Sequence, residues 1–413
     1  MDSMDKPQLR PLLFVMTEMQ GRRVILAQDQ SGVAQPALLP PELEPILRLL
    51  DGGHSLRDIQ MDLMRSQGGK LVSLDDVTAI VEELDSHLLL DSPRFRETIE
   101  LEKRFWDQAR LRKPFHIGRA YPDEPEELLK MIEGFYCDES GPGKRSEDDE
   151  HKTVARGILS PHIDIGNGGP TFAWAFSRLA PKPHADLYVI LGTAHNPTPG
   201  PFSISRKDYV TPLGILETDQ EFLSELLGKY SPEWLTDDAA HQAEHSIEFQ
   251  TIFLKHILGP GDSTKAIPIL VGSFGEFLAN CSSPAKIPEV SKFLDAFKDV
   301  AGKSGKKITY IVGGDLAHIG PRYGDRDAVL PMDVEACLAK DKEMLEAAAK
   351  GAEEFFDYVA REGDCRKICG MPPLYTMLKL IEGAKGDILH QSYWFDESTR
   401  SAVTFAAMAF EQY

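Results

Sequence analysis

The chain has 413 residues, enough for two or three domains of ordinary size, so its core needs no disulfide or metal for stability. Hydrophobic residues make up 42% of the sequence and charged residues 27%, which is typical of a globular protein and excludes a disordered or fibrous one. The 65 acidic residues outnumber the 45 Lys and Arg, giving a net charge of −20. Because nucleic-acid binding requires a basic surface, this balance argues against a general nucleic-acid-binding protein.

The termini and cysteines indicate a cytoplasmic protein without membrane contact. The first twenty residues contain only a short apolar run, and no stretch approaches the roughly 20 apolar residues that span a bilayer. Five cysteines are too few for a disulfide scaffold in a chain of this length, and their odd number leaves at least one thiol unpaired. We therefore expect reduced thiols.

The N-terminal region predicts a small winged-helix-like α+β module. Residues 9–31 contain two β-prone runs on either side of Gln20-Gly21, the pattern of a hairpin. A helix is expected over residues 40–53, and two more over 55–66 and 73–90, each opened by a Ser followed three residues later by Asp, as in a capping box. A charged helical connector over residues 96–114 then leads into the next domain, so we expect domains at 1–110 and 111–413.

The first module resembles the PqqD-like domains over roughly residues 9–95. The shared pattern consists of Leu49-Leu50-Asp51-Gly52, Ser55, Ile59 and Leu88-Leu89-Leu90. This resemblance implies that the module binds a peptide or a radical-SAM protein, and the alternative is a helical appendage that packs on the main domain. Residues 1–110 contain 13 basic and 19 acidic residues, which disfavours a DNA-binding winged helix.

The second region predicts an α/β fold with a largely parallel sheet covered by helices on both faces. Its short, continuously apolar runs at 154–159, 185–191, 266–271 and 308–312 alternate with helical stretches such as 217–229 and 245–258. In such sheets ligands bind beyond the carboxyl ends of the strands.

Polar residues with useful chemistry follow three of these strands. His162 follows the first run, His195 the second, and Asp315 and His318 the last. A single histidine at such a place is usually a hydrogen-bonded loop residue, but three strand ends with the same pattern favour a site. We interpret five other histidines as surface or packing residues: His116, His151, His184, His256 and His390.

A weaker candidate pair lies near the start of the helix expected over residues 245–258. His245 and Glu248 are three residues apart, so both project from one side of this helix. Taken alone, such a pair is usually an ordinary surface pair.

Seven segments, in order, resemble the Memo family, which includes the bacterial AmmeMemoRadiSam system protein B. They are residues 120–128, 160–162, 192–195, 211–214, 244–248, 314–318 and 368–370. The family shares its fold with class III extradiol dioxygenases, so the resemblance implies a mixed, largely parallel sheet flanked by helices. The sequence departs from many family members after His162 and at Asn196-Pro197, and both departures alter the rim of the pocket.

The resemblance also implies a metal site held by His162, His195 and Cys369. Two imidazoles and a thiolate suit Fe(II) or Cu(I), and Zn is also accepted. By the same resemblance His318 is the catalytic acid/base and Asp315 orients it or a ligand histidine, while His245 and Glu248 line the opposite wall. Cys365 is either an ordinary thiol or a redox neighbour of Cys369.

Two functions are consistent with these residues. The first is a metal-dependent redox protein, an oxidoreductase or extradiol-type dioxygenase that acts on a small-molecule or dioxygen-derived substrate. The second is a non-catalytic adaptor that binds a peptide or a radical-SAM partner. Catalytic turnover distinguishes them.

Overall fold

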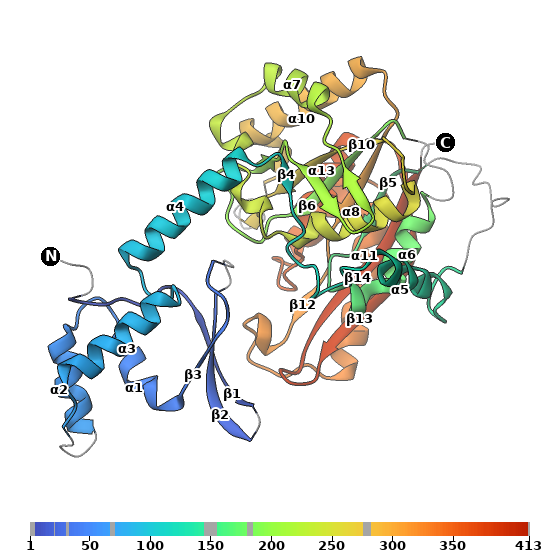
Figure 1. The fold of residues 1–413 in the computed structure, drawn as a ribbon. Helices are drawn as coiled ribbons and strands as arrows, with labels where there is room; N and C mark the ends of the chain where they lie inside the picture. The colour runs from blue at the N-terminus through green and yellow to red at the C-terminus, as the bar shows by residue number, and fades with distance from the viewer. Residues whose placement is uncertain are drawn as a thin grey trace. The chain divides into compact units, whose positions relative to one another are not determined.

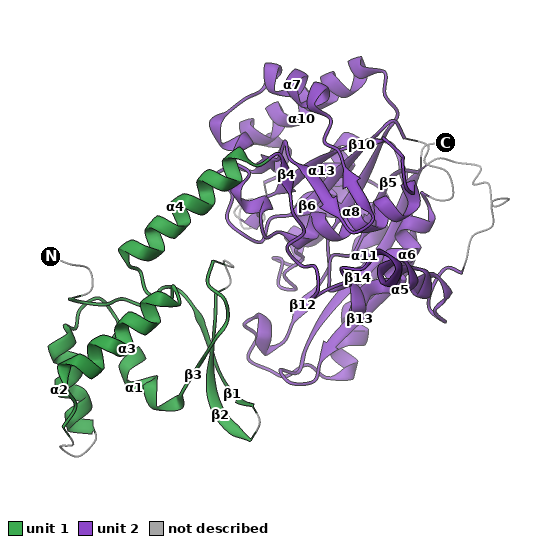
Figure 2. Cartoon of the chain, viewed as in Figure 1, with its two compact units in different colours: residues 1–109 green, residues 110–413 purple. Residues whose placement is uncertain are grey.

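The computed structural model describes residues 5–19, 21–29, 33–66, 71–143, 155–179, 185–275 and 282–411. His151, His184 and Cys281 lie outside these ranges. The chain divides into two compact units, residues 1–109 and 110–413 (Figure 2). Within the described ranges, every helix is too short or too polar to cross a bilayer.

Unit 1 combines a three-stranded antiparallel sheet with short helices (Figure 1). The expected hairpin forms from β1 (Leu13–Met19) and β2 (Arg22–Gln28), with Met19 opposite Arg22, and β3 (Ala37–Leu39) pairs with β2. The helical elements are η1 (Pro41–Leu43), α1 (Glu44–Leu47), α2 (Leu56–Ser66), α3 (Leu74–Ser86) and α4 (Pro93–Gln108). Both expected capping boxes form, at Ser55 with Asp58 and at Ser73 with Asp76.

The helix expected over residues 40–53 is much shorter in the structure. Only Glu44–Leu47 is α-helical, and a 3₁₀ turn precedes it. Pro45 explains why the α-helix begins only at Glu44, because a proline has no backbone N–H and fits an α-helix only in its first turn. The hydrophobic spacing is nevertheless used, since Ile46, Leu47 and Leu50 are buried in the core of this unit.

Unit 2 is built around an eight-stranded mixed sheet. The strand order is β12-β14-β5-β11-β6-β10-β7. The eighth strand, β13, lies outside this order and pairs with β14 along its whole length. The four central strands β5, β11, β6 and β10 are parallel, and the outer strands join antiparallel. The bounds are β5 (Ala155–Ser160), β6 (Leu187–Thr193), β7 (Phe202–Ile204), β10 (Lys265–Val271), β11 (Ile308–Gly313), β12 (His318–Ile319), β13 (Lys385–Asp396) and β14 (Ser401–Glu411).

Helices cover both faces of this sheet, which explains why its central parallel strands are largely apolar and buried. Along β6, Leu187, Val189 and Leu191 face one hydrophobic cluster, and Tyr188 and Ile190 face the other. The first cluster is covered by α7 (Gln220–Lys229), α10 (Pro288–Ser304), α11 (Pro331–Ala348), α12 (Ala352–Arg361) and α13 (Met371–Leu380). The second is covered by α5 (Pro125–Cys137), α6 (Ile165–Ser177) and α8 (His245–Leu258).

The predicted α/β fold of this region, a mixed and largely parallel sheet flanked by helices, is therefore confirmed.

A small second sheet in unit 2 has the order β4-β8-β9. Its strands are β4 (Leu111–Arg112), β8 (Asp208–Thr211) and β9 (Gly214–Leu216). Short 3₁₀ turns complete this unit at η2 (Glu233–Thr236), η3 (Ala239–His241), η4 (Pro284–Lys286) and η5 (Pro321–Tyr323).

Candidate metal centre

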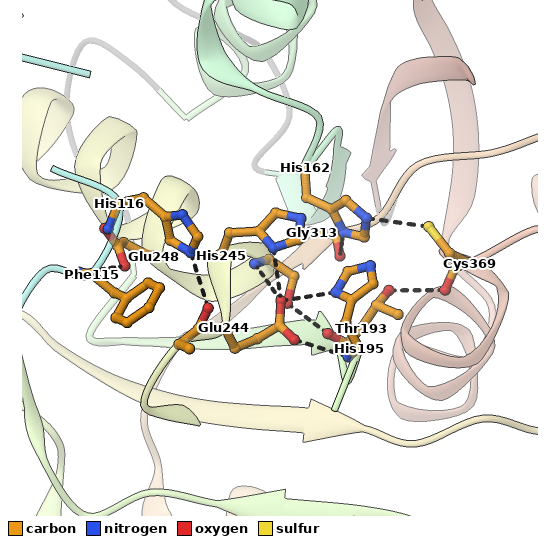
Figure 3. A network of polar contacts seen from close by, with 12 residues as sticks. Phe115, His116, His162, Thr193, His195, Glu244, His245, Glu248, Gly313 and Cys369 are labelled. Atoms are coloured by element: carbon orange, nitrogen blue, oxygen red, sulfur yellow. Dashed lines mark hydrogen bonds and ion pairs between the residues drawn. The ribbon is translucent and has the colours of Figure 1, made fainter. Parts of the chain in front are cut away.

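Three histidines meet beyond the carboxyl ends of β5 and β6. The ligand atoms of His162, His195 and His245 all lie within 4.8 Å of one another. His162 follows β5, His195 follows β6, and His245 is the first residue of α8. Their ring centroids are 4.6 to 5.1 Å apart, and Figure 3 shows the rings facing one another.

His162 is fixed by the strand end beside it. Its backbone N–H donates to Asp315 Oδ1 at 2.9 Å, and its Nδ1 lies 3.0 Å from the Gly313 carbonyl oxygen. A carbonyl only accepts hydrogen bonds, so Nδ1 carries the hydrogen and Nε2 keeps its lone pair. His162 is 2% exposed, and this burial lowers its pKa to about 3. The ring is therefore a neutral imidazole, the form that binds metals.

Glu244 orients the other two rings. Its Oε1 lies 3.0 Å from His195 Nδ1 and 3.3 Å from His245 Nδ1, and its Oε2 accepts the His195 backbone N–H at 2.9 Å (Figure 3). As the N-cap of α8, Glu244 also accepts the Ser246 N–H. A carboxylate that accepts from Nδ1 leaves Nε2 of each ring available as a ligand, an arrangement found around many metal-bound histidines.

The electrostatics of this group centre on the Glu244 charge. Burial alone would raise the Glu244 pKa, but its hydrogen bond and charge interaction with His195 outweigh burial and lower it. Burial likewise opposes protonation of His195, yet the Glu244 hydrogen bond and charge raise the His195 pKa overall. Burial lowers the pKa of His245. The His195 and His245 side chains keep 39% and 30% of their surface exposed, so a ligand can reach them from solvent.

A thiol lies against this cluster. Cys369 Sγ is 3.2 Å from His162 Nε2 and 3.6 Å from the Asp315 carbonyl oxygen, and the Cys369 carbonyl accepts the Thr193 hydroxyl at 2.8 Å. Burial and the neighbouring Asp315 raise the Cys369 pKa well above its usual value, so without a metal it is a neutral thiol. A bound cation would deprotonate it. The structure thus groups His162 and His195 with His245, and it places the Cys369 thiol next to His162.

Asp315 and His318 lie beside the cluster. Burial raises the pKa of Asp315 to about 6, and its Oδ2 is 3.7 Å from His162 Nε2. His318 Nδ1 lies 3.1 Å from the carbonyl oxygens of both Leu316 and Lys367, which again leaves Nε2 unprotonated in the neutral ring. Burial lowers the His318 pKa.

Glu248, expected on a pocket wall, is instead engaged in a buried ion-pair network. Its carboxylate contacts the Arg112 guanidinium and the Tyr121 hydroxyl, and it accepts the backbone N–H groups of Phe115 and His116 at 3.0 and 2.9 Å. Arg112 is fully buried and supplies the opposite charge. The network holds the segment that carries His116, whose ring packs 5.6 Å from that of His245.

Neither Glu244 nor Arg112 was expected in a functional role from the sequence. An acidic residue directly before a helix was the available signal for Glu244, because such residues commonly cap helix N-termini. Arg112 has no comparable local signal. Of the remaining candidates, Cys365 is an exposed free thiol.

The chain is similar to known proteins over most of its length. A family model described as "Memo-like protein" matches residues 112–409. A MEMO1 family protein of Aquifex aeolicus is 29% identical over 409 residues, which covers 98% of this chain and 100% of that protein. MEMO1 family proteins of Ignicoccus hospitalis (30% identical, covering 73% of this chain and 98% of the relative) and Methanobrevibacter smithii (32%, covering 54% and 76%) are also similar.

Proposed function

Since the chain belongs to the Memo family, as its ordered motifs predicted, we propose that it is a metal-dependent redox protein. His162, His195 and His245 hold one transition-metal ion, with Cys369 as a further ligand. The observation that carries this proposal is the orientation of the three rings: their Nδ1 atoms all face acceptors, which leaves the Nε2 lone pairs for a ligand, and His162 Nε2 points at the Cys369 thiol.

The donor set fits a borderline or soft cation. Imidazole nitrogens with one thiolate suit Fe(II) and Cu(I), and they also accept Zn. When bound, iron or copper supplies one-electron exchange with dioxygen or a small reductant. We favour an oxidoreductase that acts on a small-molecule or dioxygen-derived substrate over extradiol-type ring cleavage, because a thiolate changes the charge and redox preference of the ion relative to a carboxylate.

The chain's own residues position the ion and handle protons. Asp315 holds the backbone of His162, and Glu244 holds the rings of His195 and His245. His318 has its Nδ1 fixed by two carbonyl oxygens, so its Nε2 is the atom that accepts and returns a substrate proton.

Metal analysis after anaerobic purification tests the proposed site. We expect about one ion per wild-type chain, and His162→Ala and His245→Ala to retain about tenfold less. His87→Ala, a substitution of an exposed histidine in unit 1, is the matched control and should keep the wild-type content. Equal metal content in all four proteins would contradict the site. Oxygen consumption with a panel of catechols and other small reductants then tests turnover, which should fall in His318→Gln.

A second function, peptide or radical-SAM binding by unit 1, is favoured by the edge strand β1. Among the described residues it pairs with β2 alone, and it exposes Leu13, Val15, Met16 and Met19 by 39 to 51%. An apolar edge strand is the usual surface for adding a strand from another chain. Co-precipitation of the full-length protein with a radical-SAM enzyme from its own organism tests this, and Val15→Pro should abolish it. Co-precipitation unaffected by Val15→Pro would contradict the role of β1.

A further inference from the structure

A pocket opens at the end of the large sheet opposite the metal centre, and we propose that it binds an organic phosphate ester. We call it the basic pocket. Its volume is about 580 Å³, within the range of ordinary small-molecule sites. It is lined by Ala155, Arg156, Lys298, Ala301, Gly302, Lys306, Lys307, Ile308, Thr309, Tyr310 and Leu380.

The basic pocket is separate from the metal centre. Ala155 and Ile308 are the first residues of β5 and β11, whereas His162 and Asp315 follow the last residues of the same two strands. A six-residue strand is roughly 20 Å long. A ligand in the basic pocket therefore lies at the opposite edge of the sheet, beyond contact with the three histidines.

The charge of the lining is opposite to that of the whole protein. Four lining side chains are cationic and none is acidic, in a chain with a net charge of −20. Glu382, which pairs with Lys298 at 3.2 Å, and Asp219, which pairs with Lys306, both lie outside the lining. Among the described residues, the Lys307 ammonium has no ion-pair partner. Because Lys298 and Lys306 are partly neutralised by these carboxylates, Lys307 supplies most of the charge that attracts an anion to this end of the sheet.

The apolar part of the lining indicates what the anion is attached to. Ala155, Ala301, Ile308 and Leu380 contribute hydrocarbon surface between the cationic groups. Lysine ammonium groups bind phosphate as point charges, and small-molecule sites combine a few such polar groups with an apolar wall. A phosphate ester with an organic moiety uses both parts of the lining, whereas inorganic phosphate uses only one.

Calorimetric titration of the full-length protein tests this with three probes: adenosine diphosphate, inorganic pyrophosphate and adenosine. We expect saturable binding of adenosine diphosphate, weaker binding of pyrophosphate and no binding of adenosine. The Lys298→Gln/Lys307→Gln double variant should bind adenosine diphosphate about tenfold more weakly, because two charged contacts are lost. Pyrophosphate binding as tightly as adenosine diphosphate would overturn the assignment of an organic ester.

Two controls locate the binding. Lys292→Gln/Lys342→Gln removes the same charge from exposed positions outside the pocket, and it should bind within twofold of wild type. His162→Ala should also bind normally. If both double variants bind adenosine diphosphate equally weakly, the effect comes from the overall charge of the protein and not from the pocket. Loss of binding in His162→Ala would place the ligand at the metal centre. Absence of saturable binding to the wild type would also overturn the proposal. Unfolding temperatures equal to that of wild type establish that each variant is folded.

Discussion

Replacing Glu244 with Gln is the most informative single change at the metal centre, because it keeps the size of the side chain and removes its charge. In the wild type, Oε1 faces His195 Nδ1, His245 Nδ1 and the Ser246 N–H, while Oε2 accepts the His195 N–H. An amide offers only one acceptor oxygen. We expect that oxygen to take the Oε1 position, which leaves the His195 N–H facing an NH₂ group.

The expected loss of metal affinity depends on which contacts to the histidine rings each variant keeps. Loss of the group that orients a ligand histidine typically weakens metal binding by 10- to 100-fold, or about 1.4 to 2.7 kcal/mol. Glu244→Gln retains both ring contacts without the charge, so we expect the lower end, about tenfold. Glu244→Ala leaves both rings without an acceptor, so we expect about 100-fold.

Competition with a chromophoric chelator measures both affinities, and Glu233→Gln, an exposed acid in the same unit, is the control. Because Glu244 also caps α8, urea unfolding of each variant establishes that the comparison is made on folded protein. Wild-type affinity in both folded Glu244 variants, within twofold, would refute the orienting role of this carboxylate. Equal losses of metal affinity in Glu244→Gln and Glu244→Ala would refute the expectation that the alanine variant binds metal more weakly.

Three further outcomes are expected. Arg112→Met should lower the free energy of unfolding by about 3 to 5 kcal/mol in urea titrations, because it leaves the buried Glu248 charge unpaired; a loss below 1 kcal/mol would contradict this. Burial would raise the Glu248 pKa, but the charge interaction with Arg112 outweighs it and lowers this pKa below its ordinary 4.5. The stability advantage of wild type over Glu248→Gln should therefore be complete above pH 4.5 and shrink as the pH falls further. An advantage that does not change between about pH 6 and pH 3 would contradict this pKa shift. Cys369→Ser should weaken Cu(I) binding more than Zn binding, because thiolate is the softer ligand; a Cu(I) affinity equal to that of wild type in competition assays would count against Cys369 as a ligand.

The central strands were predictable because both of their faces are buried. Residues 308–312 and 266–271 are apolar without alternation, and they form β11 and β10 nearly as expected. The antiparallel strands β13 and β14 were not predicted. Within β14 every residue is buried, yet its Ala-rich composition gives little local preference for a strand.

The sequence predicted those site residues that directly follow the strands of the central sheet. His162 and His195 meet because the carboxyl ends of β5 and β6 lie at one edge of the sheet. The part played by Glu244 depends on how α8 is placed against that edge, which residue spacing does not specify. The same holds for Cys369, whose loop contains Asp364 and Lys367 at positive φ, a conformation without a local sequence signal at these residues.

X-ray absorption spectroscopy of the iron- or copper-loaded full-length protein tests the metal centre most directly. We expect a single metal environment with imidazole nitrogen scatterers and one sulfur scatterer, and loss of the sulfur contribution in Cys369→Ser. A spectrum of the loaded wild type without imidazole scattering would contradict the three-histidine site, and one without sulfur would remove Cys369 from it.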